Sequence, residues 1–187
     1  GRRVEILSER TADSSVYANP DGTTTAEAYA GPVRVKQADG TWRTIDTDLT
    51  DVGPDLEPQV SPADVSVSDG GDKALVSITR GSKVFGLGWP EKLPAPTVHG
   101  DTASYGLGDD ATLTVKALAQ GFEQSVVLDR APTEPVVYRI PLHTDGLTLS
   151  QADSGHLLLK DTDGKLVAEA PAPMMWDSSK DKASGEP

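Results

Sequence analysis

Two short acidic stretches carry the side chains best suited to metal chemistry. Asp161 and Asp163 alternate in DTDG, and Asp46 and Asp48 alternate in DTDL, so each pair offers the hard oxygen ligands that calcium prefers. An EF-hand loop also needs a third oxygen ligand before its glycine and a glutamate after it, and neither stretch supplies both. The apolar LVAEA that follows DTDGK favours a hairpin turn there. Asp161 and Asp163 are therefore weak calcium candidates, and we otherwise expect no metal or cofactor.

Hydrolytic chemistry has little support in the sequence. The three histidines, His99, His143 and His156, stand beside glycine, threonine or the ends of predicted strands, and no Gly-x-Ser-x-Gly motif occurs. Ser154 and His156 are too close along the chain to form a catalytic pair. We expect no catalytic residue and no enzymatic activity. A pair of carboxylates facing each other across a cleft stays open as an alternative, because their separation depends on the fold.

Aromatic rings are the other group that could bind a ligand, since sugars stack on exposed rings. Aromatic residues make up only 5% of the chain. Four of them fall at alternating strand positions that are typical of core anchors: Trp42, Phe85, Phe122 and Tyr138. The remaining candidates for ligand binding are Tyr17, Trp89, Tyr105 and Trp176. For each of these, partial burial at a strand edge is the favoured interpretation, and a glycan-binding platform is the alternative.

The charge and composition of the chain limit the classes of molecule that it can bind. Among 187 residues, 17 Lys and Arg stand against 29 Asp and Glu, which gives a net charge of −12 and repels nucleic acid phosphates. No apolar run approaches the roughly 18 residues of a membrane span. We therefore expect no nucleic acid binding, because of the charge, and no membrane insertion, because such a run is lacking. Cysteine is absent, which excludes disulfides and thiolate sites. An acidic chain rich in Thr, Asp, Gly and Ala is typical of an exported bacterial domain.

Sharp corners recur along the chain. YANPDGT at residues 17–23 is followed by QADGTW, SDGGDK, TDG and DTDGK, and most of these corners precede a run of alternating apolar and polar side chains. Glycine adopts positive φ without steric cost, and aspartate caps a turn through its carboxylate. We interpret YANPDGT as a corner in which Pro20 sets φ, Asp21 and Gly22 close the turn, and Thr23 begins the next strand.

These patterns predict an all-β protein of antiparallel strands with almost no helix. The expected strands lie within residues 4–7, 23–30, 33–36, 42–45, 63–68, 74–79, 83–87, 103–107, 111–118, 122–129, 135–142, 147–151, 156–161 and 165–170. The KALAQGF stretch is compatible with one helical turn. The acidic, proline-containing residues 46–62 are expected to form an extended loop or linker, because proline cannot donate to a β ladder. WPEKLPAPTV at 89–98 is expected to be a rigid connection anchored by Trp89, with a proline-rich recognition ligand as the alternative.

We predict two antiparallel β-sandwich units, residues 1–61 and 62–187, with one continuous β-sandwich as the alternative. Residues 46–62 or 89–98 would join the two units. The predicted core consists of Val33, Val35, Trp42, Ile45, Val76, Ile78, Phe85, Leu113, Val115, Phe122, Val126, Leu128, Val137, Tyr138, Ile140, Leu158 and Val167.

Three ordered segments carry a resemblance to a known kind of protein. They are RTADSSVYANPDGTTTAEAYAGPVRVKQADGTWRTIDTDL, LGWPEKLPAPTVHGDTASYGL with LTVKALAQGFEQSVVL, and DTDGKLVAEAPAPMMWDSS. Together they resemble the amino-terminal β-rich region of large secreted actinobacterial proteins that carry DNRLRE-type domains and RHS/YD repeats, the wall-associated and polymorphic-toxin type. The resemblance covers nearly the whole chain and includes no catalytic pattern.

That resemblance implies a secreted or cell-surface protein and a non-enzymatic role as a scaffold that presents or delivers other domains. The implied partners are neighbouring domains of the parent chain. We expect, accordingly, a structural or interaction domain of a secreted, surface-associated or toxin-delivering multidomain protein. The alternative is a module that binds carbohydrate, namely cell-wall glycan.

Overall fold

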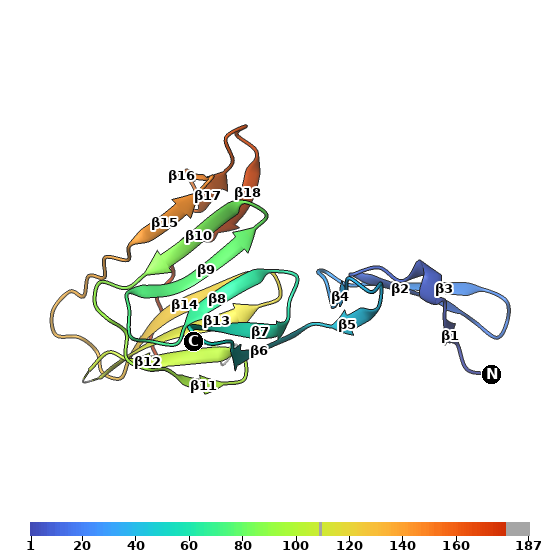
Figure 1. The fold of residues 1–187 in the computed structure, drawn as a ribbon, viewed down its shortest axis with the longest axis horizontal. Coiled ribbons are helices and arrows are strands. Elements are labelled where there is room, and N and C mark those ends of the chain that lie inside the picture. Colours follow the sequence, from blue (N-terminus) through green and yellow to red (C-terminus); the bar gives the residue numbers. More distant parts are fainter. Residues whose placement is uncertain (109, 179–187) are drawn as a thin grey trace. The chain divides into compact units, whose positions relative to one another are not determined.

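The chain folds as an all-β protein in the computed structural model, which describes residues 1–108 and 110–178 (Figure 1). Apart from one short 3-10 turn, η1 (Leu7–Glu9), its regular elements are strands. All the strand pairs with a defined register are antiparallel. The chain divides into two compact units, residues 1–143 and 144–187. The all-β prediction is confirmed.

The first unit begins with two small sheets. The strands β1 (Val4–Glu5), β2 (Ser14–Ala18) and β3 (Thr24–Ala28) form a three-stranded sheet, and β4 (Arg34–Lys36) pairs with β5 (Trp42–Thr44). A backbone bond joins the two sheets, since the Val33 amide donates to the Ala12 carbonyl at 2.9 Å. We refer to residues 1–45 as the N-terminal strands.

A larger sheet follows directly. Its order is β15-β10-β9-β8-β7-β6, formed by β6 (Asp46–Asp51), β7 (Asp55–Val60), β8 (Asp64–Ser68), β9 (Ala74–Arg80), β10 (Lys83–Gly88) and β15 (Leu142–Asp145), which begins at the end of the first unit. Residues 46–62, which we expected to be a linker, instead supply the β6–β7 hairpin. β7 pairs with β8 only at Asp55 and Leu56. Pro58, which lies opposite Leu49 of β6, comes after this short ladder, so no N–H is needed there on the side that faces β8.

The second large sheet of this unit has the order β11-β12-β13-β14, formed by β11 (Thr97–His99), β12 (Thr102–Gly106), β13 (Ala111–Leu118) and β14 (Gly121–Leu128). β13 and β14 pair along their whole length and meet at a two-residue turn, Ala119–Gln120. The helical turn considered for KALAQGF is therefore wrong, because this stretch continues the hairpin.

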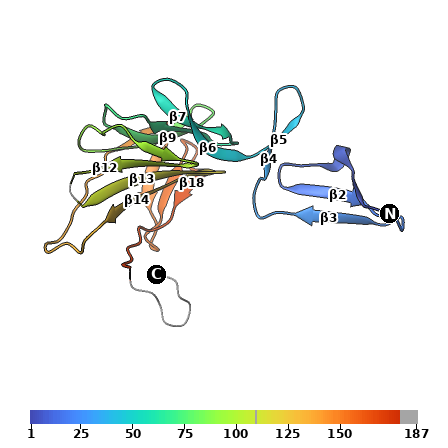
Figure 2. The same ribbon diagram turned by 90° about the horizontal axis from the view of Figure 1, so that it is seen from below.

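The two large sheets face each other as a β-sandwich (Figure 2). Their inner faces supply most of one hydrophobic core: Leu49, Leu56, Val65, Val67, Leu75, Val76, Ala103, Tyr105, Leu113, Val115 and Ala117. Aromatic and polar contacts also cross between the sheets. The Phe85 and Phe122 rings stack with centroids 6.2 Å apart, and the Tyr105 hydroxyl donates to the Ser68 carbonyl at 2.6 Å. This core fixes the register of both sheets, since slipping one strand by a residue would turn its apolar side chains outward.

The predicted core is right for the sandwich and wrong elsewhere. Val76, Phe85, Leu113 and Val115 are buried. Ile78, Phe122, Val126 and Ile140 pack against the core while partly exposed. Predicted members among the N-terminal strands, Val33, Val35, Trp42 and Ile45, are half-buried and lie outside the sandwich core, as do Leu158 and Val167 in the second unit.

Three predicted core residues, Leu128, Val137 and Tyr138, are exposed. The strand expected over residues 135–142 does not form, because residues 129–141 run outside any ladder and only Leu142 joins β15. Three prolines in this stretch, Pro132, Pro135 and Pro141, cannot donate to a ladder.

The connection after β10 packs as the sequence predicts. Trp89 and Leu93 are buried in the sandwich core. The Gly71 amide donates to Leu93 O, and the Leu93 amide donates to Asp72 O, both at 2.8 Å. Gly70 permits this close approach, because a Cβ on it would lie 2.5 Å from the Pro94 carbonyl oxygen. WPEKLPAP is thus a rigid connection anchored by its tryptophan.

The YANPDGT corner also folds as expected. Gly22 has φ of +86°, and the Asn19 amide donates to Thr23 O at 2.9 Å to close the β2–β3 hairpin. The Asp21 carboxylate accepts hydrogen bonds from the Thr23 amide at 3.0 Å and from its hydroxyl at 2.7 Å. The carboxylate in this stretch serves the turn.

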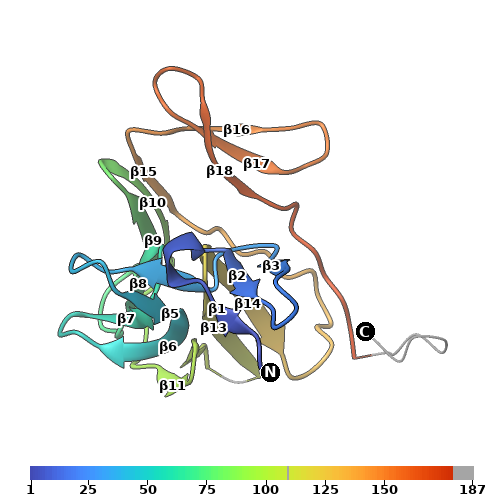
Figure 3. The same ribbon diagram turned by 90° about the vertical axis from the view of Figure 1, so that its right-hand side faces the viewer.

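The second unit contains a three-stranded antiparallel sheet (Figure 3). Its strands are β16 (Thr148–Gln151), β17 (Leu157–Lys160) and β18 (Leu166–Ala170). The register aligns Leu149, Leu159 and Ala168 on one face, and Leu159 is buried. After β18 the described chain runs without regular structure to residue 178, and Met174, Met175 and Trp176 are exposed.

The division into units differs from the expected boundary at 61 and 62. β7 and β8 stand on either side of that boundary and pair with each other, Leu56 opposite Val67, so both belong to one sheet. The structure divides instead between His143 and Thr144. Residues 179–187 of the expected second unit lie outside the described residues.

Candidate functional site

Two of the four candidate ligand-binding rings are core residues. Tyr105 has 0% of its surface exposed and Trp89 has 6%, so neither ring offers a face to a sugar. Burial raises the pKa of Tyr105 far above its usual range, with a smaller contribution from Asp69. The expectation that Tyr105 and Trp89 bind a ligand is therefore wrong, because both rings pack in the core.

The other two candidate rings are accessible. Trp176 is 58% exposed in the second unit, and Tyr17 is half-buried on β2. The Arg3 guanidinium lies over the Tyr17 ring, 4.2 Å from its centroid, and Arg3 also pairs with Glu27 at 2.7 Å. One face of the Tyr17 ring is therefore covered by a cation.

The calcium candidates lie in the turn between β17 and β18. One carboxylate oxygen of Asp161 accepts hydrogen bonds from the Asp163 amide at 3.1 Å and from the Lys165 amide at 2.9 Å. The Asp163 side chain is exposed. Among the described residues, no group of three or more His, Cys, Asp or Glu side chains is placed to hold a metal ion.

Within residues 1–108 and 110–178, no hydrogen bond joins a histidine to a serine or threonine hydroxyl. His156 Nδ1 contacts Glu169 Oε1 at 2.5 Å in the second unit. His99 lies on β11 and His143 on β15, both exposed.

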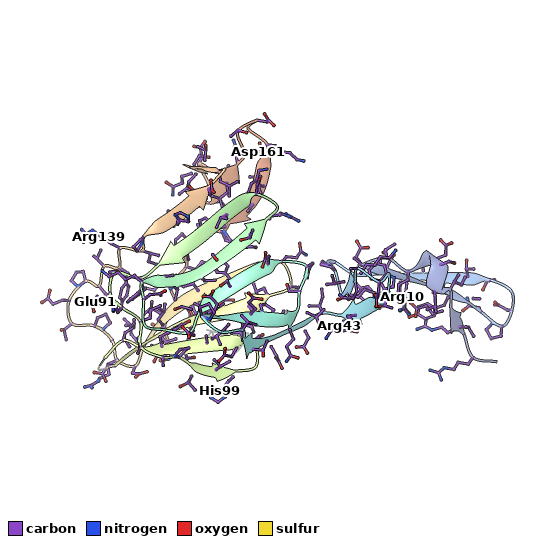
Figure 4. The ribbon with its side chains drawn as sticks, viewed as in Figure 1. Arg10, Arg43, Glu91, His99, Arg139 and Asp161 are labelled. Atoms are coloured by element: carbon purple, nitrogen blue, oxygen red, sulfur yellow. The ribbon has the colours of Figure 1, made fainter. Side chains whose placement is uncertain are left out.

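A cluster of paired polar side chains lies among the N-terminal strands, where Figure 4 labels Arg10. A hollow of about 200 Å³ opens there, lined by Glu5, Arg10, Ser15, Tyr17, Arg34, Trp42 and Thr44. We call it the Arg34 hollow. Its walls come from β1, β2, β4 and β5 together with the chain that follows η1, so the hollow exists only when both small sheets are joined.

Charged hydrogen bonds hold these walls together. Arg10 pairs with the Glu5 carboxylate through both Nε, at 2.9 Å from Oε1, and Nη2. Arg34 Nη2 donates to Ser15 Oγ at 2.8 Å, Nη1 donates more weakly to the Ser14 carbonyl at 3.4 Å, and Nη1 lies 3.6 Å from Glu5 Oε1. Ser15 is the one buried residue found among the described positions 1–45. Arg34 thus ties β4 to β1 and β2.

The same pairing sets the electrostatics of the hollow. The hydrogen bond from Arg10 holds the pKa of the Glu5 carboxyl below its ordinary value, against a partial opposing effect of desolvation. Glu5 in turn raises the pKa of Arg10. Glu5 is therefore an anion at neutral pH, and neither it nor the Arg10 guanidinium is placed to exchange protons there. The cluster is suited to binding and to holding strands together.

Sequence reasoning missed Glu5, Arg10, Ser15 and Arg34. Arg34 and Ser15 are separated by a strand and two turns, and such distant polar contacts leave no periodic signal. The sequence contained one hint. In β4, Arg34 and Lys36 flank Val35, so the strand has little apolar surface to bury, and a charged side chain that it does bury needs a partner on another element.

A second hollow, of about 310 Å³, lies between Gln37, Arg43 and residues 57–65. It lacks the paired charges of the Arg34 hollow, since Arg43 makes no ion pair in the described part of the chain. Within the same described residues, no helix is long and apolar enough to span a membrane.

Comparisons with known proteins leave the chain without a relative at significant similarity. No family model matches it, no curated protein matches it, and no solved structure matches it. The function must therefore be argued from the geometry of the chain itself.

Proposed function

We propose that this chain is a non-enzymatic structural or interaction domain of a secreted, surface-associated or toxin-delivering multidomain protein. Its partners are then neighbouring domains of the parent chain. The resemblance to the β-rich region of DNRLRE- and RHS/YD-containing proteins motivates this context. The fold is compatible with it, because a β-sandwich is a rigid scaffold that can present loops to other domains.

One observation carries the proposal: acidic side chains of the turns and of the Arg34 hollow serve the fold. Asp21 and Asp39 each accept hydrogen bonds from the amide and hydroxyl of a threonine two residues on. Asp161 closes its own turn, and Glu5 is held by Arg10. The threonine hydroxyl bonds lower the pKa of Asp21 and of Asp39. The carboxylates of Asp21 and Asp39 therefore stay ionised and hydrogen-bonded, whereas a general acid must carry a proton.

An activity assay tests the proposal. The purified chain is incubated with soluble cell-wall glycan, and the release of reducing ends is compared with a heat-denatured sample. A structural domain releases no more than the denatured control. An activity that one acidic substitution abolishes would overturn the proposal.

A glycan-binding module is the second candidate, favoured by the accessible rings of Tyr17 and Trp176. A ligand that binds only the folded state raises the melting temperature, and its stabilising free energy grows with the logarithm of one plus its concentration over its dissociation constant. A rise in melting temperature with soluble cell-wall glycan that is lost in Tyr17→Ala or Trp176→Ala supports this candidate. The same melt with millimolar calcium tests Asp161 and Asp163, and Asp163→Ala is the variant that should remove any calcium effect.

A further inference from the structure

The Arg34 hollow has the size of a small ligand. At about 200 Å³ it is smaller than the ~300 Å³ at which pockets for drug-sized molecules begin. Since a water occupies ~30 Å³ of liquid, the hollow has room for several waters or for one compact polar molecule. Its lining residues include the aromatic residues Tyr17 and Trp42 and the hydroxyl-bearing Thr44, whereas the Ser15 hydroxyl is already bonded to Arg34.

The charge of this region differs from that of the rest of the chain. Residues 1–45 carry six basic and six acidic side chains, so their formal charges cancel and the net charge of −12 resides in the remaining residues. In the hollow itself, two guanidinium groups stand against the single carboxylate of Glu5. A further cation, Lys36, lies 5.9 Å from the centroid of the Trp42 ring. An anion repelled by the rest of the chain therefore meets a local excess of positive charge here.

Donor groups remain available on both arginines. Arg10 uses Nε and Nη2 for Glu5, and Arg34 uses Nη1 and Nη2 for Ser14, Ser15 and Glu5. Within the described part of the chain, Arg10 Nη1 and Arg34 Nε have no hydrogen-bond partner. Guanidinium groups fixed by protein partners recognise carboxylates with little loss of side-chain freedom. The existing bonds to Glu5 and Ser15 thus orient the donors that are left.

We propose that the Arg34 hollow binds a sugar acid, with the ligand carboxylate on the guanidinium groups of Arg34 and Arg10. A ligand hydroxyl meets Thr44, and the ligand ring lies against Tyr17 and Trp42. This inference goes beyond the structural role and gives the second candidate function a defined ligand, so it rests on that candidate. A carboxylate on a hydroxyl-bearing ring matches the mixture of cations, hydroxyls and aromatic rings better than a bare anion does.

Titrations of the whole chain by amide NMR test this proposal, with D-glucuronate, D-glucose, acetate and inorganic phosphate as the probes. D-glucuronate is expected to shift the amides of Glu5, Ser15, Arg34 and Thr44 in a saturable manner. D-glucose and acetate at the same concentration are expected to shift them little, because each presents only half of the recognised chemistry.

Two variants and a matched control sharpen the titration. Arg34→Gln is expected to weaken D-glucuronate binding tenfold or more, the effect of losing a charged hydrogen bond. Thr44→Val, which removes a lining hydroxyl that makes no side-chain bond within the protein, is expected to weaken it several-fold without disturbing the strands. Arg43→Gln lies on the same strand but lines the other hollow, and should leave the affinity unchanged.

Several outcomes would overturn the proposal. Equal shifts with D-glucose show that the carboxylate is not recognised, and equal shifts with acetate or phosphate show a bare anion site. An affinity for D-glucuronate that survives both Arg34→Gln and Thr44→Val places the ligand elsewhere. Binding of cell-wall glycan that persists in Arg34→Gln and is lost in Trp176→Ala refutes the hollow while leaving glycan binding in place.

Discussion

The N-terminal strands and the β-sandwich reach a stable arrangement by different means. The sandwich buries Leu75, Leu113, Val115 and Tyr105 almost completely between two sheets. Among residues 1–45 the one buried side chain is that of Ser15, and charged hydrogen bonds from Arg10 and Arg34 join the strands. Apolar burial depends little on pH or salt, whereas charged pairs depend on both.

This difference shows where function can be placed. A region held by hydrophobic packing has few free polar groups, because its interior must be dry. A region held by guanidinium and carboxylate groups keeps donors at its surface, as Arg34 does, and can offer them to a ligand. The sandwich is thus the rigid body, and the N-terminal strands carry the recognition chemistry.

The largest expected effect is at the centre of the sandwich. Leu113 is fully buried, so Leu113→Ala removes apolar contacts and leaves a cavity, at a cost of about 2–5 kcal/mol in the free energy of unfolding. Trp42→Ala should cost clearly less, because Trp42 is only half-buried on β5. Urea denaturation followed by circular dichroism measures both. Equal losses of unfolding free energy in the two variants would contradict the distinction between the two regions.

Gly70 and Gly71 offer a matched pair in the sandwich. Both have positive φ, +98° and +87°, but a Cβ on Gly70 would lie 2.5 Å from the Pro94 carbonyl oxygen, whereas a Cβ on Gly71 meets nothing within 4 Å. Gly70→Ala should therefore be more destabilising than Gly71→Ala by about 1–3 kcal/mol, the usual cost of overpacking. Thermal melts of the two variants compare them. Equal melting temperatures would show that Trp89 to Pro94 is not held against this turn.

The stability of the two regions is also expected to depend differently on pH. The pKa of Glu5 in the folded chain lies below its ordinary value of 4.5, chiefly through Arg10, so its stabilising effect is complete above pH 4.5 and is lost as the pH falls through the folded pKa. The N-terminal strands should loosen below pH 4.5 while the sandwich persists. Glu5→Gln should already loosen them at pH 7 and reduce the change on acidification. Fluorescence of Trp42, in a variant with Trp89 and Trp176 replaced by Phe, reports this region.

The smallest effect is expected at a single turn. Asp39 accepts hydrogen bonds from the Thr41 amide at 2.9 Å and hydroxyl at 2.7 Å, so Asp39→Ala removes both while Asp39→Asn keeps an acceptor. Asp39→Ala should lower the melting temperature of the N-terminal strands by a few degrees at most, and Asp39→Asn by less. If Asp39→Asn proves as damaging as Asp39→Ala, the negative charge of the carboxylate matters more than its role as an acceptor in the turn.

The sequence predicted those features that depend on neighbours along the chain. Alternating residues and Asp-Gly corners identified β9, β10 and β13 and the turn at Gly22. Features that depend on distant partners were missed. The proline-bearing β7 becomes a strand only because β6 and β8 flank it, and residues 135–141 fail to become one although their valines and tyrosine favour a strand. The partners of Arg34 could not be predicted for the same reason.

Hydrogen exchange tests the central claim most directly. Protection factors are measured for amides of β2, such as that of Tyr17, which lies opposite Thr25 of β3, and of β13, such as that of Val115, at pH 7 and at pH 3.5. If charged pairs hold the N-terminal strands and apolar burial holds the sandwich, protection at Tyr17 falls at pH 3.5 while protection at Val115 changes little. A parallel fall at both amides would contradict the account, because it would mean that the two regions share one source of stability.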